Sequence, residues 1–214
     1  MVASVIPQPS ALPVLEEDVN SLYESFGLSD LGLSKDAFRT AYKGYNNLKK
    51  KGRVDVTRYL TICDLSQSSR KKRLYVLDME SEEVVMNTFV AHGRNSGYEY
   101  ATKFSNTPSS HRSSLGFYVT LNTYQGDHGL SLRLKGLEPG FNDKAYSRAI
   151  VIHGAGYIED SYLNRSGRMG RSFGCPAIPK SESDEIINTI KDGTLVFVYH
   201  PTVTYLKRSR ILNG

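Results

Sequence analysis

Hydrophobic periodicity divides the chain into two parts. Before Gly52, apolar residues recur three or four positions apart, which is the spacing of one face of an α-helix. After Gly52, short runs of β-branched and aromatic residues alternate with turn-forming segments, a pattern typical of β-strands. The pattern therefore predicts a helical N-terminal segment followed by a mostly β domain, an α+β fold.

Two helices are predicted before Gly52. The first has an apolar face of Leu15, Val19, Leu22 and Phe26 and ends at Gly27. The second is capped by Ser34 and closes at a run of lysines, which suits the negative end of a helix and requires no nucleic-acid ligand. Residues 1–13 contain three prolines and are expected to form a loose lead-in.

Seven strands are predicted after Gly52, at residues 59–65, 73–78, 84–91, 115–121, 131–134, 149–153 and 195–200. One late helix is expected after Pro179, with Ser181 or Ser183 as its cap and Gly193 just past its end. We expect two units, residues 1–52 as a lead-in and helical segment packed on the rest, and residues 53–214 as the mostly β domain.

Composition narrows the class of protein only slightly. A hydrophobic content of 39% and a charged content of 23% are ordinary for a soluble globular chain of 214 residues. The net charge of +5 suits a polyanionic partner without identifying one. Fourteen tyrosines and no tryptophan leave two interpretations open, a tyrosine-lined groove or the half-buried face of a sheet.

The stretch from His153 to Pro176 carries the candidate chemistry. His153 ends a predicted buried strand, and Cys175 lies between Gly174 and Pro176 in a polar, glycine-rich segment that is poor material for a core. A histidine at a strand end can take the proton of a thiol, and two adjacent N–H groups can bind an oxyanion. The arrangement predicts a nucleophilic cysteine that transfers an acyl group through a thioester.

A buried cysteine that only packs is the alternative to a nucleophile. Cys63 fits that alternative, because it lies in the apolar, strand-like run at residues 59–65. The two cysteines would permit one disulfide, but oxidation of Cys175 would abolish its chemistry. We therefore expect two free thiols.

The motifs around His153 and Cys175 resemble those of the YkuD-type L,D-transpeptidase catalytic domain, specifically its murein L,D-transpeptidase branch. The family motif is His-Gly-(Thr/Ser/Ala), a variable loop, then Ser-His-Gly-Cys-(Ile/Val)-Arg. This chain has Phe173 in place of the second histidine and Pro176-Ala177 in place of the last two residues, but it keeps the branch pattern Gly-Arg-Ser-x-Gly-Cys-Pro. Further similarity lies at residues 90–94, 104–106, 113–118 and 140–143, so the resemblance runs from about residue 58 to the C-terminus.

The resemblance implies a YkuD-like β-sandwich or barrel and a peptidoglycan substrate. Cys175 would be the nucleophile and His153 the base, with a backbone carbonyl near Gly154 fixing the histidine tautomer. The N–H groups of Gly174 and Cys175 would hold the oxyanion. The expected reaction releases D-alanine from a tetrapeptide stem and forms a 3→3 cross-link. The rivals are an L,D-carboxypeptidase, in which water accepts the acyl group, and a wall-binding module without catalysis.

Substrate contacts are less well defined, because the arginine that usually follows the cysteine is missing. Arg171 and Arg168 are candidate substitutes for binding the donor carboxylate, and Ser172 and Tyr118 are added as expected contacts. An equally open alternative is that Arg171 binds a loop carbonyl and only stiffens the turn. His92-Gly93-Arg94 would either shape the groove or terminate a strand.

Other site classes find little support in the sequence. The chain has five histidines, but no two of them have the close spacing of zinc ligands on one element, and it has no CxxC motif. We therefore expect neither a metal site nor a cofactor. The basic clusters at residues 70–73 and 207–210 are short and lack interleaved aromatics, so no nucleic-acid binding is expected. No apolar run reaches the roughly 18 residues of a membrane span. The expected partners are peptidoglycan stem peptides and carbapenem-type inhibitors, bound by a monomer.

The expected location is the periplasm or the cell exterior. Residues 1–7 show no basic start and no apolar stretch, and so no signal peptide. Members of the resembled family are exported, so we expect a mature or trimmed form with an added Met1.

Overall fold

The computed structural model describes residues 12–54 and 56–214. The predicted lead-in lies almost entirely outside these residues. The strands are β1 (Tyr59–Asp64), β2 (Leu74–Asp78), β3 (Glu83–Thr88), β4 (Gly116–Gly126), β5 (Gly129–Gly136), β6 (Val151–Ala155), β7 (Ala177–Pro179) and β8 (Leu195–Tyr199). The helices are α1 (Leu12–Ser25), α2 (Lys35–Lys50), α3 (Asp160–Ser166), α4 (Ser183–Ile190), α5 (Val203–Arg208) and α6 (Arg210–Asn213). The predicted α+β fold is confirmed.

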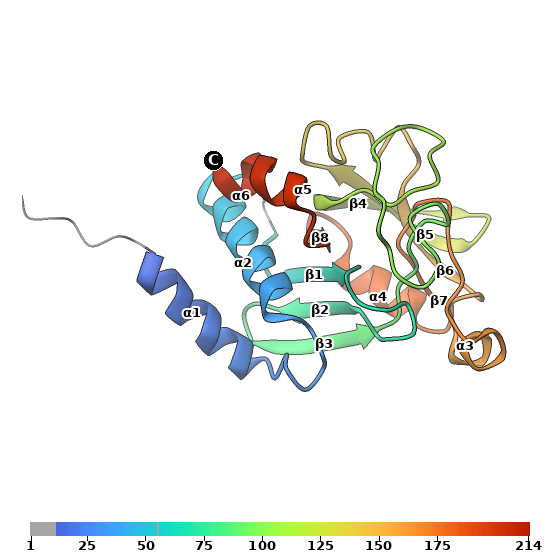
Figure 1. The fold of residues 1–214 in the computed structure, drawn as a ribbon, viewed down its shortest axis with the longest axis horizontal. Coiled ribbons are helices and arrows are strands. Elements are labelled where there is room, and N and C mark those ends of the chain that lie inside the picture. Colours follow the sequence, from blue (N-terminus) through green and yellow to red (C-terminus); the bar gives the residue numbers. More distant parts are fainter. Residues whose placement is uncertain (1–11, 55) are drawn as a thin grey trace, which may run out of the picture.

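All eight strands form one sheet in the order β3-β2-β1-β8-β4-β5-β6-β7 (Figure 1). The two halves of the sheet are joined by β8, which pairs in parallel with β1 and antiparallel with β4. At the far edge, β6 pairs antiparallel with β5 and in parallel with β7. Strands from both ends of the sequence therefore share one hydrogen-bonded framework.

The main core lies between this sheet and α2, which packs on β1, β8 and α6. In the core, the Phe117 ring stacks on Phe197 with their centroids 4.1 Å apart. Gly44 in α2 faces the Phe117 ring so closely that an added Cβ would overlap it. Glycine at this position therefore allows the helix to approach the sheet, although the domain boundary at residue 52 stays a prediction.

The predicted helices are largely confirmed, but one capping prediction is wrong. Ser34 caps α2, and its Oγ accepts a hydrogen bond from the Ala37 N–H at 3.1 Å. The late helix is α4, with Ile186, Ile187 and Ile190 buried as expected, but neither serine caps it. Instead, the Ser181 hydroxyl donates to Glu159 and the Ser183 hydroxyl donates to the Lys180 carbonyl, each at 3.0 Å.

Four short elements were not predicted, namely β7, α3, α5 and α6. They are three to seven residues long, too short for a periodic pattern to identify. None of the described helices is long and apolar enough to cross a membrane.

Candidate active site

The pairing of β6 with β7 brings His153 and Cys175 to the same end of the sheet. His153 lies in β6 in register with Ala177, the first residue of β7. Cys175 lies two residues before Ala177, at the end of the long connection that parallel strands require. His153 and Cys175 both line one pocket of about 390 Å³.

A small second core supports the connection between β6 and β7. Ile158 and Met169 are fully buried there, together with Ala155, the last residue of β6, and Ala177, the first residue of β7. Tyr157 packs against this cluster and also lines the pocket. The loop that carries the cysteine is therefore anchored by apolar packing as well as by strand pairing.

His153 is buried and held in one tautomer. Its Nδ1 lies 3.0 Å from the Gly154 carbonyl oxygen, which can only accept, so Nδ1 carries the proton and Nε2 keeps a free lone pair. Burial lowers the pKa of His153, the Gly154 hydrogen bond opposes the shift, and His128 adds to it. The contact with Gly154 is the one expected; the catalytic roles of both residues stay predictions.

His128 covers His153, a feature that the sequence analysis missed. The two imidazole rings stack with centroids 4.4 Å apart and planes at 18°. His128 belongs to the exposed turn between β4 and β5, and it lines the same pocket. The contact arises from the pairing of β5 with β6, for which no local sequence signal exists.

The Cys175 thiol donates to the Ala149 carbonyl oxygen, with Sγ 3.7 Å away. Burial raises the pKa of Cys175, while a hydrogen bond from the Val151 backbone and the charge of Arg148 act in the opposite direction. Ala149 has a φ of +53°, a left-handed conformation that is strained for a residue with a side chain. The strained residue thus presents its carbonyl to the protonated thiol of Cys175.

Arg148 is a second residue of the pocket that sequence reasoning missed. Its two terminal nitrogens donate to Ser105 O and Arg112 O at 2.9 Å, and to the hydroxyls of Ser114 at 2.7 Å and Ser110 at 3.3 Å. None of these four acceptors is charged, so the positive charge is held in place without being neutralised.

Ser172 shapes the turn before Cys175. Its hydroxyl accepts a hydrogen bond from the Gly174 N–H at 3.0 Å and donates to the Cys175 carbonyl at 2.6 Å. Gly174 has a φ of +125°, and an added Cβ would lie 2.9 Å from the Arg112 carbonyl oxygen, so only glycine fits. Two expectations change: Ser172 is occupied within the turn, and the Gly174 N–H is already bonded in this conformation.

The two predicted arginines point mainly to the loop at residues 93–98. Arg171 donates from Nη1 to Arg94 O at 3.1 Å and to Gly97 O at 2.9 Å, which favours the loop-stiffening alternative, although Arg171 also lines the pocket. Arg168 donates to Met169 O at 2.9 Å and lies 4.0 Å over the Tyr98 ring. Neither arginine has an ion-pair partner in the described part of the chain.

His92 has a structural position. It is fully buried, and its Nδ1 lies 2.8 Å from Nη2 of the buried Arg73. Burial and the Arg73 charge lower the pKa of His92 to about 3. Because Arg73 can only donate, His92 Nδ1 accepts and Nε2 carries the proton toward Gly97 O, 3.4 Å away. Of the two roles considered for residues 92–94, His92 takes the structural one.

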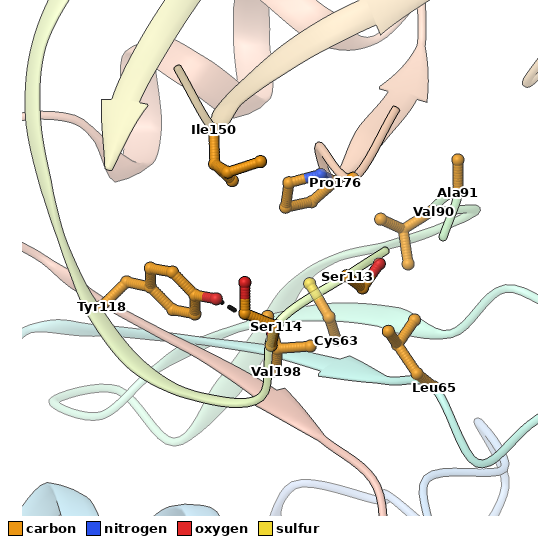
Figure 2. A pocket seen from close by; sticks show the side chains of 11 residues that line it. Cys63, Leu65, Val90, Ala91, Ser113, Ser114, Tyr118, Ile150, Pro176 and Val198 are labelled. Carbon is orange, nitrogen blue, oxygen red and sulfur yellow. Dashed lines mark hydrogen bonds between the residues drawn. The ribbon is translucent and has the colours of Figure 1, made fainter. Parts of the chain in front are cut away.

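Tyr118 was predicted to contact substrate, and its burial shows that prediction to be wrong. It is 1% exposed and its hydroxyl donates to the Ser114 carbonyl at 2.9 Å. Figure 2 shows its ring next to Ser114, among the side chains around a small cavity. That cavity measures about 10 Å³ and is also lined by Cys63 and Pro176. Cys63 and Cys175 are both free thiols, as expected.

No metal site accompanies these residues. Among residues 12–54 and 56–214, no three histidine, cysteine, aspartate or glutamate side chains gather closely enough to hold a metal ion. The pocket instead combines a thiol, a neutral imidazole and a fixed guanidinium.

The sequence profile of the L,D-transpeptidase catalytic domain matches residues 29–199 of this chain. The chain belongs to that family. The match includes both His153 and Cys175 and excludes all of α1. The predicted resemblance is therefore confirmed, and none of the curated proteins matches the sequence.

Solved L,D-transpeptidases also match the structure of this chain, at low sequence identity. One from Mycobacterium smegmatis is 13% identical with a TM-score of 0.41 over 67% of this chain and 59% of that one. LdtMt1 in complex with imipenem is 11% identical with a TM-score of 0.41 over 66% and 59%. Residues 123–326 of an L,D-transpeptidase from Xylanimonas cellulosilytica are 18% identical with a TM-score of 0.39 over 93% and 100%. The chain thus spans about three-fifths of the first two structures.

Proposed function

We propose that this chain is a cysteine acyltransferase that acts on peptidoglycan stem peptides at the cell wall. The observation that carries the proposal is the placement of Cys175 and His153 in one pocket, with the His153 tautomer fixed by Gly154 so that Nε2 is free to accept a proton. Family membership supports the same conclusion. Family membership, rather than the pocket itself, supports the proposed peptidoglycan substrate and exported location.

The proposed reaction has two halves. The Cys175 thiol gives its proton to His153 Nε2, and Sγ attacks the carbonyl between the third residue and the terminal D-alanine of a tetrapeptide stem. The oxyanion collapses, the C–N bond breaks, and the imidazolium returns the proton to the amine of D-alanine. A side-chain amine of another stem then attacks the thioester, which frees the thiol and leaves a 3→3 cross-link.

The oxyanion needs donors that are free when it forms. The Cys175 N–H is the proposed first donor. The Gly174 N–H would join it only after leaving the Ser172 hydroxyl, its partner at 3.0 Å. Each donor of this kind is worth about 3–4 kcal/mol of transition-state stabilisation. Rotation of the Ser172 hydroxyl group away from Gly174 is thus a proposed step on substrate binding.

The test is incubation of the purified protein with tetrapeptide muropeptides, followed by mass spectrometry. Cross-linking gives a dimer lacking one D-alanine, hydrolysis gives a tripeptide, and a wall-binding module returns the substrate unchanged. We expect the dimer. Imipenem is present in the solved structure of LdtMt1. We expect it to acylate Cys175 here and to increase the mass of the intact protein by the mass of one imipenem molecule. Neither product nor adduct should appear with Cys175→Ala.

A further inference from the structure

A group of cationic and aromatic side chains borders the Cys175 pocket and has no part in the mechanism above. It comprises Arg94, Tyr98, His111, Arg168, Arg171 and Phe173, and we call it the arginine rim. Arg171 and Phe173 belong to the pocket wall itself, and Arg171 connects to the rest through its hydrogen bond to the Arg94 carbonyl. The rim is therefore continuous with the site of the nucleophile.

Phe173 is the apolar centre of one half of the rim. Its side chain is 63% exposed although it lies two residues before Cys175. The guanidinium of Arg94 lies 4.6 Å from its ring centroid and the His111 ring lies at 4.8 Å. Arg94 also bonds to His111, with Nη2 and Nδ1 2.9 Å apart. An exposed phenylalanine held in this way offers a flat apolar surface that a ligand can cover.

Tyr98 is the centre of the other half. It is 66% exposed, with the guanidinium of Arg168 4.0 Å and that of Arg171 5.2 Å from its ring. A hydrogen bond from Arg168 lowers the pKa of Tyr98. Two guanidinium groups thus contact one exposed aromatic ring at the border of the pocket.

The charges of the rim are not neutralised within the described residues. Arg94, Arg168 and Arg171 bond to backbone carbonyls or to a histidine nitrogen, and no ion pair to a carboxylate involves any of them. The Nε of Arg168 is buried without a hydrogen-bond partner. His111 has a φ of +51°, an uncommon conformation for a residue with a side chain. Unpaired guanidinium donors beside a catalytic pocket favour an anionic ligand.

We propose that the arginine rim is a carboxylate-binding subsite, which makes the enzyme select stem peptides with free carboxylates over the same peptides with amidated ones. The inference rests on the proposed function. A guanidinium binds a carboxylate through two parallel, charge-assisted hydrogen bonds, and an amide cannot replace either the charge or both acceptors. Phe173 and Tyr98 then cover the apolar part of the peptide. Arg148 does not serve this purpose, because its terminal nitrogens are already bonded.

The test compares two tetrapeptide stems that differ only in one carboxylate, free or amidated. We expect the wild-type protein to show a kcat/KM about tenfold or more higher for the free acid. The double variant Arg94→Gln/Arg168→Gln should lose that preference through a higher KM for the free acid, with the amidated stem unaffected. Arg165→Gln is the control, because Arg165 stacks on Tyr162 in α3 outside the rim. Equal preference in the wild type and the double variant would overturn the proposal.

A binding measurement separates this inference from the proposed function. Cys175→Ala cannot react, so calorimetry on it with the same two stems reports recognition alone. If Cys175→Ala binds the free acid more tightly and this preference disappears when the rim arginines are replaced, the subsite is supported. Failure of the intact enzyme to release D-alanine would refute only the proposed function. Tighter binding of a poly(glycerol phosphate) chain than of either stem would instead assign the rim to a phosphate polymer and overturn the proposal.

Discussion

The two cysteines line different cavities, and their surroundings differ in two respects. Cys63 is fully buried in β1, and burial raises its pKa to about 12. Burial also raises the pKa of Cys175, but this thiol lines a pocket together with His153 and Arg148. A raised pKa therefore does not separate a packing cysteine from a nucleophile. A nearby positive charge does not separate them either, since Arg73 acts on Cys63 as Arg148 acts on Cys175. Access to a pocket and the presence of a base do.

His92 and His153 show the same point for the base. Both are buried, and burial lowers the pKa of each. The Nδ1 of His92 accepts from Arg73, whereas the Nδ1 of His153 donates to a carbonyl. The proton is therefore on Nε2 in His92 and on Nδ1 in His153. Only His153 has a free nitrogen with which to accept the thiol proton.

The largest effect is expected from exchanging the nucleophile. Cys175→Ala should reduce D-alanine release by about 10⁴-fold or more, because removal of the nucleophile leaves only binding and oxyanion stabilisation. Cys63→Ala should retain activity. Activity is measured by chromatography of the released D-alanine. Full turnover by Cys175→Ala would exclude the proposed mechanism.

Replacing His153 and His92 by alanine, one at a time, should separate an effect on catalysis from an effect on stability. His153→Ala should lower kcat by about 10²- to 10⁴-fold, the usual contribution of a general base. His92→Ala should leave Arg73 with an unpaired donor and reduce the free energy of unfolding by about 1–3 kcal/mol. Thermal melting and kinetics of both variants test this. A kcat loss confined to His92→Ala would show that the base has been misassigned.

Arg148→Met should shift the titration of Cys175. Removing a nearby positive charge raises the pKa of a thiol. The pH profile of Cys175 alkylation by iodoacetamide should therefore shift to higher pH than in the wild-type protein. Arg148→Lys keeps the charge and should restore most of the profile. Ser110→Ala is the control, because it removes a hydrogen bond to Arg148 without changing charge. An unchanged profile in Arg148→Met would leave Arg148 a structural role only.

The smallest effect is expected for His128→Ala. The His128 ring lowers the pKa of His153, and it also covers that side chain. Its loss should raise the lowered pKa of His153, so the acid limb of the kcat/KM profile should move to higher pH. Movement toward lower pH would contradict this assignment.

Much of the framework was predictable because it depends on local patterns. Alternating and β-branched runs identified seven of the eight strands, and Ser34 identified the start of α2. The three-residue β7 was missed because it is defined by its pairing with β6 rather than by its own sequence. The pairing of β6 with β7 also brings His153 and Cys175 into one pocket. Their separation in the sequence does not predict this contact.

By itself, the sequence determined the strands, the capped helix, the family and the two residues that carry its motif, because each depends on residue types at short or fixed spacing. The tertiary structure alone placed Arg148 and His128 at the pocket, buried Tyr118, and turned Arg171 toward Gly97. These contacts join residues that are adjacent only after the strands pair in the order observed. Long-range pairing and burial fix which side chains are free to meet a ligand, and no local pattern encodes either.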